Sequence, residues 1–178
     1  MAHFAVSCIG ADRPGIVAAV TGALAGLGCN LEDTSMAILR GHFAMMLVVA
    51  APAGVDQAGL EAALGPPSGQ LDLVTVVRPM DDDVPASPAG EPWTVSVYGA
   101  DRPGIVHRVT ALLAGAGVNV VDLDTRVLGG DDRPVYAMVL DVTLPPGLDG
   151  GELARRLGAL AAELEVACSV RRADADVL

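Results

Sequence analysis

The hydrophobic positions of the chain follow a regular order of strands and helices. In the first half, alternation over residues 3–9 predicts a strand, and an aliphatic stripe beginning at Ile16 predicts a helix that ends near Gly26. That stripe consists of Ile16, Val17, Val20, Leu24 and Leu27. The other elements expected in this half are strands near 30–39 and 43–50, a short helix near 55–64 and a strand over 71–77.

The second half repeats this order. Its pattern predicts a strand over 93–98, a helix over 103–115, strands over 119–128 and 135–143, a helix near 150–163 and a strand near 165–171. The order is βαββαβ in each half. Right-handed crossovers and adjacent pairing then favour a four-stranded antiparallel sheet with two helices on one face. The predicted fold class is therefore α+β, with two ferredoxin-like domains.

A proline-rich and acidic segment separates the two halves. Residues 79–92 contain four prolines and the run Asp81–Asp83. This composition is typical of an extended, semi-stiff connector. We therefore predict a first domain at 1–78, a linker at 79–92, a second domain at 93–173 and a tail at 174–178.

The third strand of each half is apolar almost throughout. Phe43–Val49 has no polar alternation, and Val135–Leu140 is nearly as apolar. Such runs are typical of strands that are buried on both faces. We therefore expect the sheet face without helices to be covered, by the other repeat or by another subunit, and we predict a homodimer.

The charge of the chain limits its partners. Its 22 acidic and 11 basic residues give a net charge of −11. A field of this sign repels phosphate backbones, so no direct binding of nucleic acid is expected. The three cysteines lie in or beside apolar runs, as reduced core thiols do, and no apolar run reaches the length of a membrane span. The predicted compartment is the cytoplasm.

One octapeptide occurs in both halves. Gly-Ala-Asp-Arg-Pro-Gly-Ile-Val stands at 10–17 and again at 99–106, and 16 of 27 positions are identical when 10–36 is aligned with 99–125. Proline suits a first helical turn, the aspartate is expected to cap the helix, and the second glycine leaves the helix N-terminus uncrowded. Such a terminus suits a carboxylate, and Asp12 or Asp101 could hold an ammonium group, so a free amino acid would match. The other interpretation is that the motif only begins a helix.

These residues resemble a known regulatory module. Asp-Arg-Pro-Gly-Ile-Val, an apolar helix and then Gly-Cys-Asn-Leu-Glu-Asp at 28–33 resemble the ACT domain, and the second copy, ending Gly-Val-Asn-Val-Val-Asp at 117–122, resembles it equally. Two such domains in tandem are similar to the glycine cleavage system transcriptional repressor family. The resemblance implies regulation through a partner protein rather than through a DNA-binding domain.

The resemblance also implies which residues would bind a ligand. In amino-acid-binding ACT domains, the loop after the first strand and the residue that opens the second strand hold the ligand, usually across a domain interface. The positions that match are Asp12, Arg13, Gly15, Asn30, Asp101, Arg102, Gly104 and Asn119. We therefore expect a sensor of a small amino acid such as glycine or serine. The alternative is an interaction or assembly module without a ligand.

Catalysis is not expected. Every basic residue is arginine, which excludes a P-loop lysine and a Schiff-base lysine. The three histidines, His3, His42 and His107, have no metal-ligand spacing. The sequence therefore predicts no enzyme activity, no metal and no cofactor.

Overall fold

The computed structural model describes residues 1–80, 90–128 and 135–173. The chain divides into two compact units, Met1–Val84 and Pro85–Leu178, and each is described by itself. The predicted tail 174–178, most of the predicted linker and the tip of the second β-hairpin lie outside the described residues.

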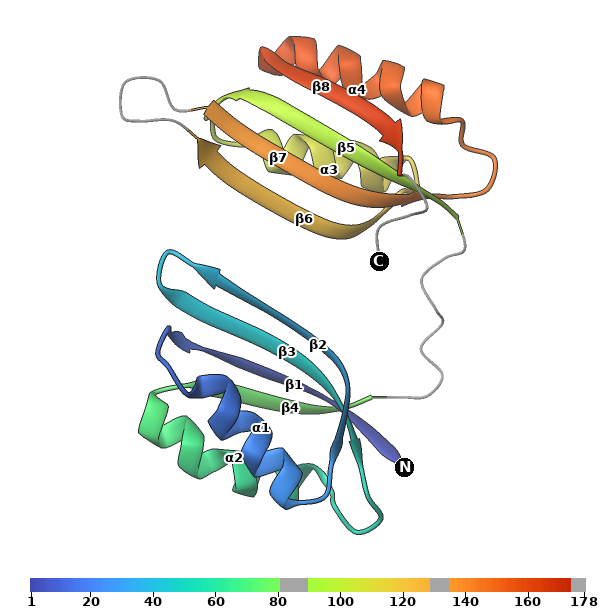
Figure 1. Ribbon diagram of the computed structural model, residues 1–178. Coiled ribbons are helices and arrows are strands. Elements are labelled where there is room, and N and C mark those ends of the chain that lie inside the picture. Colours follow the sequence, from blue (N-terminus) through green and yellow to red (C-terminus); the bar gives the residue numbers. More distant parts are fainter. Residues whose placement is uncertain (81–89, 129–134, 174–178) are drawn as a thin grey trace. The chain divides into compact units, whose positions relative to one another are not determined.

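The first unit is a four-stranded antiparallel sheet with order β2-β3-β1-β4. Its two helices lie on the same face of the sheet (Figure 1). The elements are β1 (Ala2–Ala11), α1 (Ile16–Gly26), β2 (Asn30–Leu39), β3 (His42–Ala51), α2 (Gln57–Leu71) and β4 (Val74–Met80). The core forms between the helices and the inward residues of β1 and β3, among them Val6, Leu24 and Leu47.

The second unit repeats this architecture with sheet order β6-β7-β5-β8. Its elements are β5 (Glu91–Ala100), α3 (Ile105–Gly115), β6 (Asn119–Leu128), β7 (Val135–Leu144), α4 (Gly150–Leu164) and β8 (Val166–Arg172). Val97, Leu113 and Leu140 are buried in its core. The α+β class and the two ferredoxin-like domains are therefore confirmed.

The largest differences from the sequence-based expectation lie around α2 and at the two ends of the linker. Helix α2 is not a short helix near 55–64, because it continues through Pro66 and Pro67 to Leu71. The following strand therefore begins at Val74 rather than at Leu71. Pro79 and Met80 belong to β4, and Glu91 and Pro92 belong to β5, so both ends of the predicted 79–92 linker are strand residues.

The open sheet faces, those without helices, differ between the two units. In the first unit the open face exposes Ile9, Met46, Val74 and Val76, with Asp33 and Arg78 on the same face. In the second unit the open face carries Asp122, Asp124, Arg126 and Asp141. We predicted that the open face beside the third strand is covered. The exposed apolar side chains of the first unit support this prediction better than the charged open face of the second unit does.

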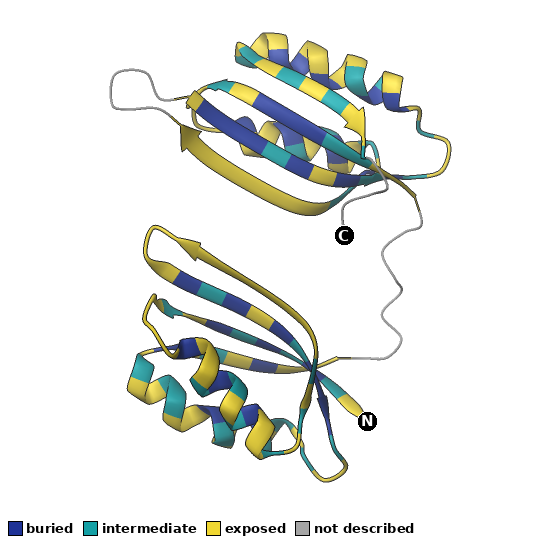
Figure 2. Ribbon diagram, viewed as in Figure 1, coloured by how far each residue is buried: buried dark blue, intermediate teal, exposed yellow. Residues whose placement is uncertain are grey.

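The edge strands β2 and β6 are exposed along most of their length (Figure 2). Met36 pairs with the buried Met45 and therefore shares the helix-covered face, yet it is about half exposed. The helices thus leave the outer edge of the sheet bare on that side too.

Candidate functional site

The repeated octapeptide forms the junction between the first strand and the first helix of each unit. Its first glycine is needed for packing. A Cβ atom on Gly10 would lie 2.6 Å from Leu73 Cδ2, and one on Gly99 would lie 2.5 Å from Val166 Cγ1. These glycines allow the segment that enters the last strand to approach the end of the first strand.

The second glycine begins the helix. Gly15 and Gly104 are the N-cap residues of α1 and α3, with φ of 96° and 93°, in the left-handed region that favours glycine. No side chain forms a capping hydrogen bond with either helix. The expectation that Asp12 and Asp101 cap these helices is therefore wrong, because the chain turns through Gly15 or Gly104 before the helix starts.

The other two helices of the protein are capped. The Asp56 carboxylate accepts a hydrogen bond from Gly59 N–H at 2.9 Å, and the Asp149 carboxylate accepts one from Glu152 N–H at 3.0 Å. Neither α1 nor α3 has an acidic residue in its first turn. The N-termini of α1 and α3 therefore present uncompensated amide groups and the positive end of the helix dipole.

The loops ahead of these helices are open to solvent. Asp12, Arg13 and Gly15 are exposed, and so are Asp101, Arg102 and Gly104. Arg102 forms an ion pair at 2.5 Å with Glu165, the C-cap residue of α4. The structure thus brings the aspartate and the helix N-terminus together on one surface in each unit.

The two asparagines lie elsewhere. Asn30 pairs with Ala50, and Ala50 pairs with His3, eight residues before Ala11. At about 3.3 Å per residue, Asn30 is roughly 26 Å along the sheet from the Asp12 loop. Asn119 lies equally far from the second loop. It pairs with Thr143, and Thr143 pairs with Pro92 at the start of β5, the end of the strand opposite to the Asp101 loop. Within one unit, therefore, a small ligand at the loop does not contact the asparagine.

Tyr136 is a candidate site residue that the sequence analysis missed. It is 8% exposed, pairs with Gly99 and packs in the same core as Ile105, the first residue of α3. Burial raises the pKa of Tyr136, and the nearby Asp101 carboxylate raises this pKa further. Its pairing with Gly99 places Tyr136 beside the strand end from which the second loop leaves. A comparison of the two repeats could have found this residue. The first unit has Phe43 opposite Gly10, whereas the second unit has a tyrosine at the equivalent position.

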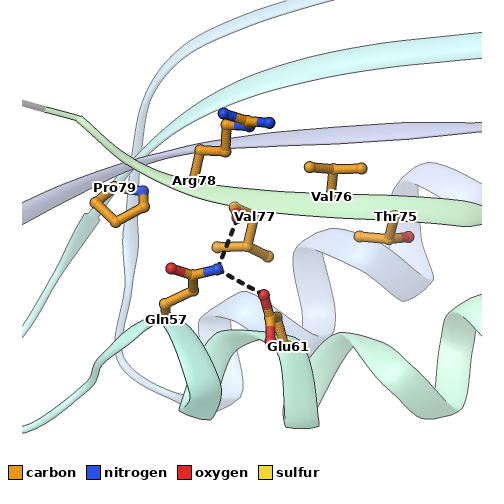
Figure 3. Close-up of a pocket in the computed structure, with 7 residues that line it drawn as sticks. All are labelled: Gln57, Glu61, Thr75, Val76, Val77, Arg78 and Pro79. Carbon is orange, nitrogen blue, oxygen red and sulfur yellow. Dashed lines mark hydrogen bonds between the residues drawn. The ribbon is translucent and has the colours of Figure 1, made fainter.

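A hollow on the first unit lies at the edge strand β4 (Figure 3). There the Gln57 side-chain amide donates hydrogen bonds to Glu61 Oε1 at 2.8 Å and to the Val77 carbonyl at 3.1 Å. Because Gln57 satisfies a carbonyl of the sheet edge, these contacts are explained by the fold. None of the residues that line this hollow belongs to the octapeptide loops.

Among the described residues, no His, Cys, Asp and Glu side chains gather in a group that could hold a metal ion. In the same part of the chain, no helix combines the length and the apolar character needed to cross a membrane.

The fold and its loops define the class of protein: a tandem of βαββαβ modules, each with an open helix N-terminus. Family models of the ACT domain match residues 2–78 and residues 93–152. The chain therefore belongs to the ACT-domain family, with one copy in each unit.

Individual relatives extend this result. The chain is 28% identical over 171 residues to the glycine cleavage system transcriptional repressor of Escherichia coli K12, covering 94% of this chain and 88% of the relative. It is 40% identical over 82 residues to a UPF0237 protein of Methanopyrus kandleri, covering 46% of this chain and 91% of that protein. A crystal structure of an unknown protein from Galdieria sulphuraria superposes with a TM-score of 0.80 at 30% identity, over 97% of this chain and 99% of that chain.

Proposed function

We propose that this protein is a non-enzymatic sensor that binds a small amino acid at the loops before α1 and α3. The helix N-terminus would hold the carboxylate of the ligand, and Asp12 or Asp101 would hold its ammonium group. The observation that carries the proposal is the missing cap: in both units an exposed aspartate lies beside a helix start that no side chain compensates.

Similarity to the ACT domain and to the repressor supports a regulatory, effector-sensing role. The relative from E. coli is by its name a repressor of the glycine cleavage system. For this chain we propose control of a partner protein, such as a transcriptional regulator, in amino-acid or one-carbon metabolism. A net charge of −11 disfavours a direct contact with DNA, so the partner would carry any nucleic-acid contact.

The expected affinity is modest. Glycine has five non-hydrogen atoms, so a ceiling of ~1.5 kcal/mol per atom limits its binding free energy to about 7.5 kcal/mol. This limit corresponds to a Kd in the micromolar range at best, and a Kd in the millimolar range is compatible with a sensor of an abundant metabolite. Titrations must therefore extend to millimolar ligand.

Calorimetry with glycine and with serine tests the proposal. The double variant Asp12→Ala/Asp101→Ala should lower the affinity by more than about tenfold, because each charge-assisted hydrogen bond contributes roughly 1.5–3 kcal/mol. The double variant Asp56→Ala/Asp149→Ala removes two aspartates that cap α2 and α4 and should retain binding. Equal affinities in the two double variants would place the ligand elsewhere.

The second candidate is an assembly module without a ligand. The apolar open face of the first unit favours it, because exposed apolar surface of this kind marks an interaction site. Under this proposal wild-type protein would release no heat with either amino acid but would still bind its partner or form the dimer.

A further inference from the structure

The open face of the first unit carries side chains in successive rows that cross its four strands. Each row follows the strand order β2-β3-β1-β4, and its members are directly paired in the sheet. The first row is Asp33, Val48, Ala5 and Arg78. The second row is Ser35, Met46, Ser7 and Val76, and the third row is Ala37, Ala44, Ile9 and Val74.

The first row has a carboxylate at one edge of the sheet and a guanidinium at the other. Asp33 lies on the edge strand β2, Arg78 lies on the edge strand β4, and both are exposed. Figure 3 shows the Arg78 side chain on the side of β4 opposite to Gln57. With about 4.8 Å between neighbouring strands, the two charged residues are roughly 14 Å apart and do not pair with each other. Arg78 has no ion-pair partner within the described part of the chain, so its charge is available to another molecule.

The side chains of these rows are matched in size to the same rows in reverse order. The second row alternates small and large side chains, and the third row has two small side chains followed by two large ones. Reversal therefore places each large side chain opposite a small one: Met46 opposite Ser7, Val76 opposite Ser35, Ile9 opposite Ala44 and Val74 opposite Ala37. In the first row, reversal places Asp33 opposite Arg78. The face is thus complementary to a second copy of itself.

We propose that the first units of two chains pack with their open faces together, around a twofold axis parallel to the strands. Such an axis reverses every row, so the Asp33 carboxylate of one protomer pairs with the Arg78 guanidinium of its partner, and the reciprocal pair forms at the other edge. Sheets packed face to face lie about 10 Å apart with interdigitated side chains, which the pairing of large with small side chains allows. A twofold axis across the strands would instead place Asp33 against Asp33 or Met46 against Met46.

This packing removes apolar surface from water. Ile9, Met46, Val74 and Val76 are 46–68% exposed in the single chain. Burial of such surface is the main driving force of association. The two ion pairs lie at the rims of the face, where charges contribute to the orientation of the partners more than to the affinity.

The second unit keeps the charged ends of the first row but not the apolar rows. Asp122 and Arg171 stand at the two edges of its corresponding row. The same face also carries Asp124, Arg126 and Asp141. Because burial of charged groups is costly, the first unit of a second copy is a better occupant of the first unit's face than the second unit is.

Charge reversal tests this inference on the full-length protein, without any ligand. Asp33→Arg alone and Arg78→Asp alone each bring two like-charged contacts into the dimer, and each should weaken it by about a hundredfold or more. Sedimentation velocity should then show monomers. An equimolar mixture of the two variants should form a heterodimer, because every charge in the mixed dimer faces its opposite. The combined variant Asp33→Arg/Arg78→Asp should form a homodimer again for the same reason.

The second unit offers matched controls. Asp122→Arg and Arg171→Asp make the same charge changes at the equivalent positions, and each should leave the dimer intact. Circular dichroism should show that all variants are folded, since the four residues are exposed.

Three results would overturn the inference: a monomeric wild type, single variants that remain dimers, or a mixture that stays monomeric. Recovery of the Asp33→Arg dimer by Arg171→Asp would assign the partner face to the second unit and would overturn it as well. These measurements involve no amino acid, so the proposed ligand binding stands or falls separately.

Discussion

The backbone N–H of Asp12 donates a hydrogen bond to the carbonyl of Gly41 at 2.9 Å. This contact attaches the loop before α1 to the turn between β2 and β3, where Gly41 has a φ of +80°. The position of the loop is thus set by the main chain, and the Asp12 carboxylate has no part in it. A side chain that is exposed and has no structural hydrogen bond is available for a ligand.

The aspartates of the octapeptide should therefore contribute less to stability than the aspartates that cap helices. Asp149→Ala is expected to lower the free energy of unfolding of the second unit by about 1 kcal/mol, because the first turn of α4 loses its cap. Asp101→Ala should change it by less than about 0.5 kcal/mol. Urea unfolding followed by the fluorescence of Trp93, the single tryptophan, measures both.

A loss for Asp101→Ala as large as that for Asp149→Ala would contradict this expectation. It would show that the octapeptide aspartate stabilises the helix after all and would favour the interpretation of the motif as a helix start alone.

The two kinds of glycine in the second unit should respond oppositely to alanine. A Cβ atom on Gly99 would meet Val166, including its Cα at 3.1 Å, so Gly99→Ala should destabilise by about 1–3 kcal/mol. A Cβ atom on Gly158, inside α4, would meet nothing within 4 Å. Gly158→Ala should stabilise by about 0.5–1 kcal/mol, because alanine has the higher helix propensity. Trp93 fluorescence in urea again gives both values, and two changes of the same sign would contradict the packing described.

The hydrophobic pattern predicted the elements well where one face of an element is buried. The predicted strand at 119–128 has the same bounds as β6. Both halves gave the same order of elements because their hydrophobic patterns are alike. The pattern failed at α2. Its apolar stripe ends at Leu64, and Pro66 and Pro67 normally stop a helix. The helix nevertheless continues to Leu71, where Leu73 N–H bonds to the Ser68 carbonyl and closes its end.

The candidate site was only partly predictable. The octapeptide indicated a helix start near an aspartate, but the backbone conformation of Gly15, which decides that this start has no cap, is not visible in a list of residues. Tyr136 was missed for a different reason. Its proximity to Asp101 depends on the pairing of β7 with β5, a tertiary relationship that brings together residues 35 positions apart.

Cys8 should resist thiol reagents in the folded protein. Burial raises the pKa of the Cys8 thiol above its ordinary value of 9.0, and the hydrogen bond from Thr75 only partly opposes this. Because the folded pKa exceeds the unfolded one, the neutral thiol contributes stability that is complete below pH 9.0 and is lost as the pH rises through the folded pKa. Iodoacetamide labelling followed by peptide mass spectrometry should show that Cys8 reacts only as the first unit unfolds. Labelling of Cys8 at the rate of a free thiol at pH 8 would contradict its burial.

The open face of the first unit should drive the predicted homodimer. Met46 lies at the centre of this face, paired with Ser7 and Ser35, and is 53% exposed in the single chain. A lysine there would place a charge in a contact that removes apolar surface from water, so Met46→Lys should shift light scattering from dimer to monomer. Val139→Lys is the matched control at the equivalent position of the second unit. It pairs with Asp124 on a face that is already polar, and it should leave the dimer intact. A monomeric wild type would contradict the predicted dimer, and dissociation by Val139→Lys alone would assign the contact to the second unit.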